Sequence, residues 1–279
     1  MSTRLTQRRR TTVAKIGMIH YNIPGTLEEF LRYAKGAGYD YVELQCSQDV
    51  WGKDVTEPEK QAEKVRKMVD AAGLKVSALA AQNDFIQPDE AGIKAQVERM
   101  QRICGLARSL GTNMIRSEGG QPKANVSPMA WPDAMAECFK RCLPFLEKDD
   151  MYLAVDNHGI VTNDIVVQLL TLKAVGSKHV GANVDTMNYR WYGHDLVVLD
   201  RIYEMIAPYA LHTHMKDGTG SRRNYKGAAL GEGEINLRKA IACLKAVGYD
   251  GVWCSEYEGK ADPSDVGYRK CADWLKKNV

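Results

Sequence analysis

Metal-binding side chains recur at regular spacing in the second half of the chain. Asp156 and Asp185 are 29 residues apart, and His214 follows Asp185 by another 29, while Glu256 comes later. Taken singly, each aspartate could cap a helix and the histidine could be a core group. Together, three carboxylates and one imidazole favour Mn²⁺ or Mg²⁺ over a structural Zn²⁺, and Co²⁺ or Fe²⁺ would also fit. The set predicts a divalent-metal site with positions left for water or substrate.

The segment LHTHMKDGTG contributes two histidines and a lysine to one face of a strand. Strand side chains alternate, so His212, His214 and Lys216 point to the same side. His214 is nearer the end of the strand and is the better ligand. His212 lies deeper, where it could pack or hydrogen-bond to a ligand. Lys216 could bind a substrate oxyanion or donate a proton, and simple solvation is the alternative.

Eight apolar, strand-like segments alternate with eight helical ones, and no linker separates them. We expect strands at 15–21, 39–45, 74–82, 112–120, 151–159, 179–188, 209–217 and 249–259. We expect helices at 26–38, 57–73, 89–111, 127–148, 163–176, 194–208, 236–248 and 262–278. Strict alternation predicts parallel strands inside a ring of helices, a single α/β (β/α)8 TIM barrel. Two Rossmann-like halves are the alternative, but YNIPG after the first strand is not a glycine-rich phosphate turn.

The barrel domain is expected to span residues 15–279, after a polar N-terminal arm at 1–14. That arm contains the run RRR at 8–10, which is a solvated tail or a phosphate contact. Barrel active sites lie where strands end at their carboxyl side. This rule adds His20, Arg116 and Asn188 to the candidate site as substrate-binding residues. Glu43 and Gln45 end the second strand.

The bulk composition limits the classes of function. The net charge is +3 and basic residues are spread along the chain, which argues against nucleic-acid binding. No apolar run reaches the length of a membrane span. The seven cysteines form no CxxC motif and favour reduced thiols in a cytoplasmic protein.

Several motifs resemble the sugar phosphate isomerase/epimerase superfamily, the xylose isomerase-like TIM barrels. The matching motifs are LAVDNHG, NVDTMN, HTHMKDG, ALGEGEINL and SEYEG. The resemblance implies that Asp156, Asp185, His214 and Glu256 hold a divalent metal, Mn²⁺, Mg²⁺ or Co²⁺. Relatives usually carry Glu where this chain has Asp156, so the proton-transfer role of that carboxylate becomes doubtful and His158 becomes the more attractive base. Endonuclease-like relatives carry many more histidines than this chain.

The reaction implied is isomerisation or epimerisation of a sugar or keto-sugar. The metal would polarise a carbonyl, and His158 or Glu256 would remove the α-proton to give an enediolate. Lys216 or Arg116 could neutralise the oxyanion. Three aromatic residues in expected rim loops could cover a sugar ring or pack the loops, namely Trp51, Trp191 and Tyr225.

Two other classes of function stay open. A lyase of the same superfamily, a dehydratase or a C-glycoside-cleaving enzyme, would use the same first step and then eliminate a group. A non-catalytic carbohydrate-binding barrel would be expected to have a degenerate site. The expected partners are a small sugar substrate and either copies of this chain or a small partner subunit, without nucleic acid or membrane.

Overall fold

The computed structural model describes residues 14–279. Strands of the barrel are β1 (Ile16–Ile19), β2 (Tyr41–Gln45), β3 (Lys75–Ala80), β4 (Met114–Ser117), β5 (Tyr152–Asp156), β6 (Val180–Asp185), β7 (Ala210–Met215) and β10 (Trp253–Ser255). Main helices are α1 (Leu27–Ala37), α2 (Pro58–Ala71), α3 (Glu90–Ser109), α4 (Trp131–Asp149), α5 (Ile165–Val175), α7 (Leu196–Ile206), α8 (Leu237–Ala246) and α9 (Ser264–Asn278). The expected alternation of eight strands and eight helices is confirmed.

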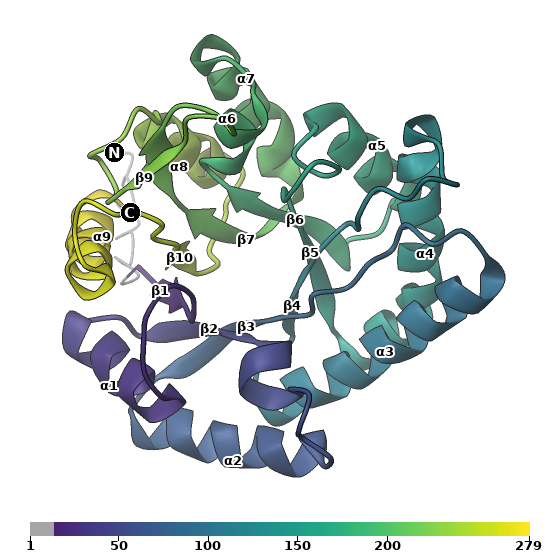
Figure 1. Cartoon of the computed structure of the whole chain (residues 1–279), viewed down its shortest axis with the longest axis horizontal. Coiled ribbons are helices and arrows are strands. Elements are labelled where there is room, and N and C mark those ends of the chain that lie inside the picture. The colour runs from purple at the N-terminus through teal and green to yellow at the C-terminus, as the bar shows by residue number, and fades with distance from the viewer. Residues whose placement is uncertain (1–13) are drawn as a thin grey trace, which may run out of the picture.

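The eight strands form one closed parallel barrel in the order β1-β10-β7-β6-β5-β4-β3-β2. Helices surround the strands on the outside (Figure 1). The predicted TIM barrel is therefore confirmed. The expected arm at 1–14 lies, apart from its last residue, outside the described part of the chain. No helix within residues 14–279 is both long enough and apolar enough to cross a bilayer.

Local sequence signals explain where the helices begin and end. Thr26 caps α1: its hydroxyl accepts from the backbone N–H of Glu29, whose carboxylate accepts from the Thr26 N–H. This reciprocal pair satisfies donors that the first helical turn leaves free. Gly38 ends the same helix at φ 88°, a left-handed conformation that costs glycine little. Asp164 caps α5, and its carboxylate accepts from the backbone N–H groups of Val166 and Val167.

Several segments differ from the expected elements. The last barrel strand covers only Trp253–Ser255, because 249–252 and 256–258 are irregular and Gly259 forms an isolated bridge with Gly227 outside the barrel. The expected seventh strand continues past Met215 into a separate antiparallel hairpin of β8 (Asp217–Thr219) and β9 (Lys226–Ala228). Two short helical segments lie outside the expected helices, namely the π-helical turn Cys46–Val50 and α6 (Asn188–Tyr192). The start of the expected helix 127–148 and the end of the expected helix 194–208 are 3₁₀ turns, Pro128–Ala130 and Ala207–Tyr209.

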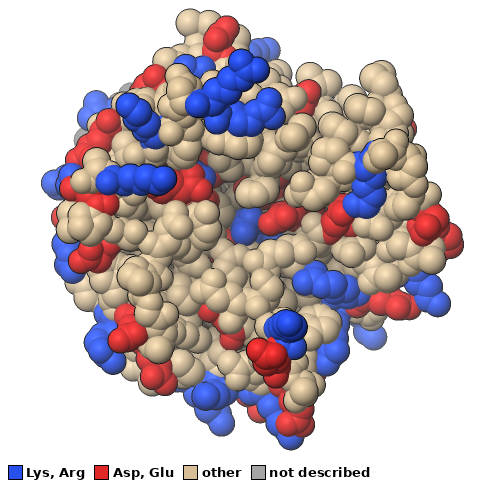
Figure 2. All heavy atoms as spheres, in the orientation of Figure 1, with Lys and Arg blue, Asp and Glu red and all other residues tan. Residues whose placement is uncertain are grey.

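Polar side chains occupy the middle of the barrel, while the apolar core lies between the strands and the helices. Glu43, Asn183 and His212 are all at most 2% exposed. Strand register brings some of these groups together, since Asn183 pairs with Asp156 across β5 and β6. Viewed as in Figure 2, the surface is hollowed near its centre, with acidic and basic side chains in the hollow.

Candidate metal and catalytic site

Four neighbouring strands carry the predicted metal ligands at their carboxyl ends. Asp156 ends β5, Asp185 ends β6, His214 is next to last in β7, and Glu256 directly follows β10. The ladder between β6 and β7 sets Asp185 directly beside His214. All four side chains are buried, with Glu256 the most exposed at 9%. The barrel thus carries all four residues at the same end, where its parallel strands finish.

Three of the four side chains converge on one point. Asp185, His214 and Glu256 each offer a ligand atom, and these atoms lie within 4.8 Å of one another. His214 Nδ1 lies 2.9 Å from Glu256 Oε2. That contact is not aligned as a hydrogen bond, and within residues 14–279 both His214 Nδ1 and Asp185 Oδ2 are buried without a hydrogen-bond partner. Buried polar atoms rarely stay unpaired. Two unpaired atoms that can each offer a lone pair, next to the Glu256 carboxylate, form a donor set that suits a divalent cation.

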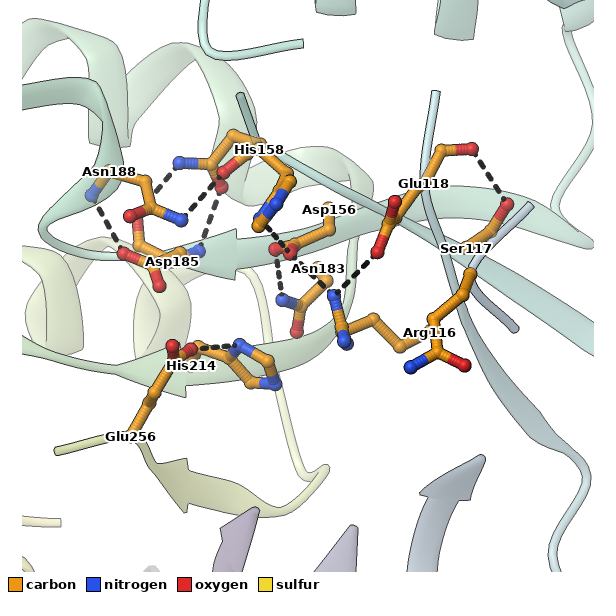
Figure 3. A network of polar contacts seen from close by, with 12 residues as sticks. Arg116, Ser117, Glu118, Asp156, His158, Asn183, Asp185, Asn188, His214 and Glu256 are labelled. Atoms are coloured by element: carbon orange, nitrogen blue, oxygen red, sulfur yellow. Dashed lines mark hydrogen bonds and ion pairs between the residues drawn. The ribbon is translucent and has the colours of Figure 1, made fainter. Parts of the chain in front are cut away.

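Asp156 lies apart from that group and belongs to a second cluster (Figure 3). Its Oδ2 accepts from Arg116 Nη1 at 2.9 Å and lies 3.6 Å from His158 Nδ1. Its Oδ1 accepts from Asn183 Nδ2 at 2.6 Å. The buried arginine supplies the positive charge that a metal ion was expected to supply. The participation of Asp156 in the ligand set stays a prediction.

The electrostatics separate the roles of the buried carboxyl groups. Burial, together with the charges of Glu256 and Asp156, raises the pKa of Asp185 to about 7. Burial acts in the same direction on Glu256, but Lys216 and His214 outweigh it and hold the pKa of Glu256 well below its usual range. A carboxylate that stays ionised is a good ligand and a poor general base. Glu256 therefore suits the metal-binding role better than the role of base.

His158 has the features of a general base. Its side chain is 48% exposed, so it reaches the open end of the barrel, and its Nδ1 faces the Asp156 carboxylate. The Asp156 carboxylate, 3.6 Å from its ring, raises the pKa of His158, although burial opposes this. A histidine oriented by a carboxylate through one nitrogen presents the other nitrogen for proton transfer.

Lys216 lies inside the site rather than in solvent. Its Nζ is 3.0 Å from Glu256 Oε1, 2.9 Å from Glu258 Oε2 and 4.0 Å from Asp185 Oδ2. It also donates to Asn188 Oδ1 at 3.3 Å. With only 4% of its surface exposed, the ammonium group is held beside the place where the metal ligands converge. Asn188, predicted to bind substrate, thus contacts Lys216.

The predicted substrate-binding residues lie in three different environments. His20 is buried, with Nδ1 2.7 Å from Asp49 Oδ1 and its ring stacked on Phe30. Trp51 lies beneath the guanidinium of Arg102, 4.5 Å from the ring centroid. Tyr225 instead lines a pocket of about 500 Å³. Lining residues of that pocket include Asn22, Trp191, Tyr225, Lys226, Glu258 and Lys260.

Glu43 is the group that sequence reasoning left without a role. It lies on β2 and is fully buried; it contacts Arg116, His212 and His214. A glutamate in the apolar strand YVELQ was visible in the sequence, and alternation predicts that it faces one side of the sheet. Its reach across the barrel depends on how the sheet closes. Arg116, predicted to bind substrate, is held between Glu43 and Asp156.

Comparison with known proteins identifies the family. The model described as a xylose isomerase-like TIM barrel matches residues 31–278. The chain belongs to this family. The resemblance drawn from the motifs is thereby confirmed. No curated protein matches the sequence.

Solved structures of xylose isomerase-like barrels superpose on most of the chain. IOLI protein with a bound zinc atom has a TM-score of 0.78 at 14% identity, covering 95% of this chain and 99% of its own. A sugar phosphate isomerase/epimerase from Parabacteroides distasonis has a TM-score of 0.75 at 18% identity, and the match covers 96% of this chain and 96% of its own. The probable 3-DHS dehydratase AsbF from Bacillus anthracis has a TM-score of 0.72 at 16% identity, and the match covers 94% of this chain and 98% of its own. At these identities the likeness shows the shared fold.

Proposed function

We propose that this protein is a divalent-metal-dependent isomerase or epimerase of a sugar or keto-sugar. The observation that carries the proposal is the pair of orphaned atoms, His214 Nδ1 and Asp185 Oδ2, buried beside the Glu256 carboxylate. These three residues would hold the ion, and a bound divalent ion would supply Lewis acidity toward a substrate carbonyl and its neighbouring hydroxyl. Mn²⁺ is the ion we expect, with Mg²⁺ or Co²⁺ as substitutes, because two carboxylates dominate the set.

The protein's own residues would move the proton. His158, oriented by Asp156, would remove the proton α to the carbonyl and return it to the adjacent carbon of the enediolate. Lys216, held by Glu256 and Glu258, would lie near the oxygen that gains negative charge. The Tyr225 and Trp191 rings line the adjoining pocket and would exclude water from one side of the sugar.

The arrangement favours reactions that need a single base. Epimerisation by two bases requires a second proton-transfer group on the opposite face of the substrate. Glu256 is a poor candidate because Lys216 and His214 oppose burial and hold its pKa low, and Asp156 is tied to Arg116 and Asn183. Transfer of the proton between two adjacent carbons needs only His158. Within the proposal we therefore favour isomerisation over epimerisation.

A lyase of the same superfamily is the second candidate. The enediolate formed by His158 could expel a leaving group from the next carbon instead of being reprotonated. The observation that favours this outcome is Lys216, an ammonium group buried within 4.0 Å of Asp185, whose positive charge would stabilise a departing oxygen. The likeness of the fold to the probable dehydratase from Bacillus anthracis agrees with a lyase but does not favour it over isomerisation.

Proton exchange in deuterated water tests both candidates. A panel of keto-sugars is incubated with protein reloaded with Mn²⁺ after treatment with EDTA, and products are followed by NMR. We expect deuterium uptake at the α-carbon only with metal, and a loss of about 10²-fold or more in His158→Gln. His194→Gln is the matched control, since His194 is half-buried and, within residues 14–279, its ring hydrogen-bonds to the Asn163 carbonyl alone. Uptake without loss of a group indicates isomerisation, and release of water or an aglycone indicates the lyase. Exchange that is equal with and without metal would contradict the proposal.

A further inference from the structure

Glu43 reaches across the barrel to the histidine that we assign to the metal. Its Oε2 lies 2.8 Å from His214 Nε2, although the two residues are 171 apart in the chain. The other ring nitrogen, Nδ1, faces Glu256 and has no hydrogen-bond partner in the described part of the chain. We propose that Glu43 is a positioning residue that locks the His214 ring with Nδ1 toward the metal. The inference depends on the metal site of the proposed function.

The contacts of Glu43 define it as an acceptor at both oxygens. Oε1 accepts from Arg116 Nε at 2.8 Å, and His212 Nε2 lies 3.0 Å from Oε2 beside the contact with His214. A carboxylate surrounded in this way offers only lone pairs, so the hydrogen of the His214 contact must sit on Nε2. A neutral imidazole with its hydrogen on Nε2 has its lone pair on Nδ1, which is the atom a metal requires.

Without Glu43, the His214 ring could present either of its two nitrogens to the metal. Either imidazole nitrogen can bind a metal, and rotating the ring exchanges them. Metal-binding histidines are commonly fixed by a carboxylate on the opposite nitrogen, and loss of that partner costs about 10- to 100-fold in metal affinity. Glu43 is fully buried and held by Arg116, so its own position is fixed. Arg116 also binds Asp156, and one guanidinium thus supports both His214 and His158.

The same surroundings allow a competing interpretation. Glu43, His212, His214 and Cys254 offer ligand atoms within 4.8 Å of one another, a donor set that a second ion could use. Arg116 Nε lies 2.8 Å from the Glu43 carboxylate and opposes a dication at that point. We therefore infer a positioning role for Glu43 and one ion per chain. Binding of two ions, with one lost in Cys254→Ser, would overturn this inference.

Metal affinity of the full chain provides the first test. Mn²⁺ binding to EDTA-treated protein is titrated by electron paramagnetic resonance for wild type, Glu43→Gln and Cys254→Ser. The amide of glutamine has a single acceptor oxygen, so one donor from Arg116 or His214 must face an N–H group. We expect Glu43→Gln to weaken Mn²⁺ binding by about 10- to 100-fold. Cys254 lies beside His214 on the neighbouring strand, and the Cys254→Ser protein is expected to bind Mn²⁺ as tightly as wild type.

The ring state of His214 in the wild-type protein provides a second test. Zn²⁺-loaded wild-type protein labelled with ¹⁵N is examined by long-range ¹H–¹⁵N NMR, with His214→Gln assigning the signal. We expect the hydrogen on Nε2 and the metal on Nδ1. A hydrogen on Nδ1, or unchanged Mn²⁺ affinity in folded Glu43→Gln, would overturn the inference about Glu43 alone. Wild-type protein that binds no ion would instead contradict the proposed function.

Discussion

Asp185→Asn is expected to stabilise the metal-free protein while removing its response to metal. The Asp185 carboxyl is fully buried, and its Oδ2 has no hydrogen-bond partner among the residues that the structure describes. Its Oδ1 accepts from the backbone N–H groups of Met187 and Asn188 at 2.8 and 2.7 Å. Asparagine keeps that oxygen and replaces the orphaned one with a neutral donor beside Glu256. The substitution therefore removes a buried charge without removing its useful hydrogen bonds.

The size of the effect follows from the pKa of Asp185. Burial, with nearby Glu256 and Asp156, raises this pKa from 3.8 to about 7 in the folded protein. Between these values the unfolded chain releases the proton while the folded protein keeps it, so stability falls as the pH rises. The folded and unfolded pKa values of Asp185 differ by about three units, and each unit corresponds to about 1.4 kcal/mol. The ionised carboxyl therefore lowers the free energy of unfolding by at most about 4 kcal/mol. The advantage of asparagine should be absent below about pH 4 and complete above about pH 7.

Urea unfolding with EDTA at pH 4 and pH 8 measures this advantage. We expect Asp185→Asn to gain about 1 to 4 kcal/mol at pH 8 and to equal wild type at pH 4. Asp195→Asn makes the same chemical change at an exposed residue and should stay within about 0.5 kcal/mol of wild type. With Mn²⁺ at about 100 times Kd, wild type should gain about 2.7 kcal/mol and Asp185→Asn nothing. An Asp185→Asn protein that is less stable than wild type at pH 8 in EDTA would refute the reasoning.

The remaining predictions concern turnover. Lys216→Met should lower the rate of α-proton exchange about 10²-fold, while Mn²⁺ affinity measured by titration stays equal or tightens, because the ammonium repels the ion. Weaker Mn²⁺ binding in that variant would count against this placement of Lys216. Trp191→Ala should raise KM about tenfold with kcat retained, and an unchanged KM in steady-state assays would remove the ring from the sugar pocket. In wild type the exchange rate should rise with pH through a pKa above 6.5, since the nearby Asp156 carboxylate raises the pKa of His158 and the base must be unprotonated. A rate profile that is flat from pH 5 to 9 would argue against His158.

The barrel was predictable because each of its units carries its own signals. The strands alternate with capped helices such as the one begun by Thr26 and ended by Gly38, and both caps are readable locally. Strand ends then identify the level at which Asp185, His214 and Glu256 meet, since parallel strands deliver their carboxyl ends to one rim. This part of the site follows from topology alone.

Contacts across the barrel could not be read from the sequence. Whether Asp156 faces a metal or an arginine depends on where Arg116 on β4 extends, and that guanidinium is fixed by Glu43 on β2. The contact with Glu43 joins β4 to β2, strands that are not consecutive in the chain, and no local pattern specifies it. The position of Trp51 could not be predicted either, because it follows an unexpected π-helical turn and packs under Arg102 of α3.

Anomalous X-ray scattering from crystals soaked in Mn²⁺ tests the central claim most directly. The account predicts one anomalous peak per chain, within bonding distance of His214 Nδ1, Asp185 Oδ2 and a Glu256 carboxylate oxygen. Asp156 should remain paired with Arg116 in the same crystals. A peak elsewhere, or no peak in crystals of protein that catalyses α-proton exchange, would contradict it.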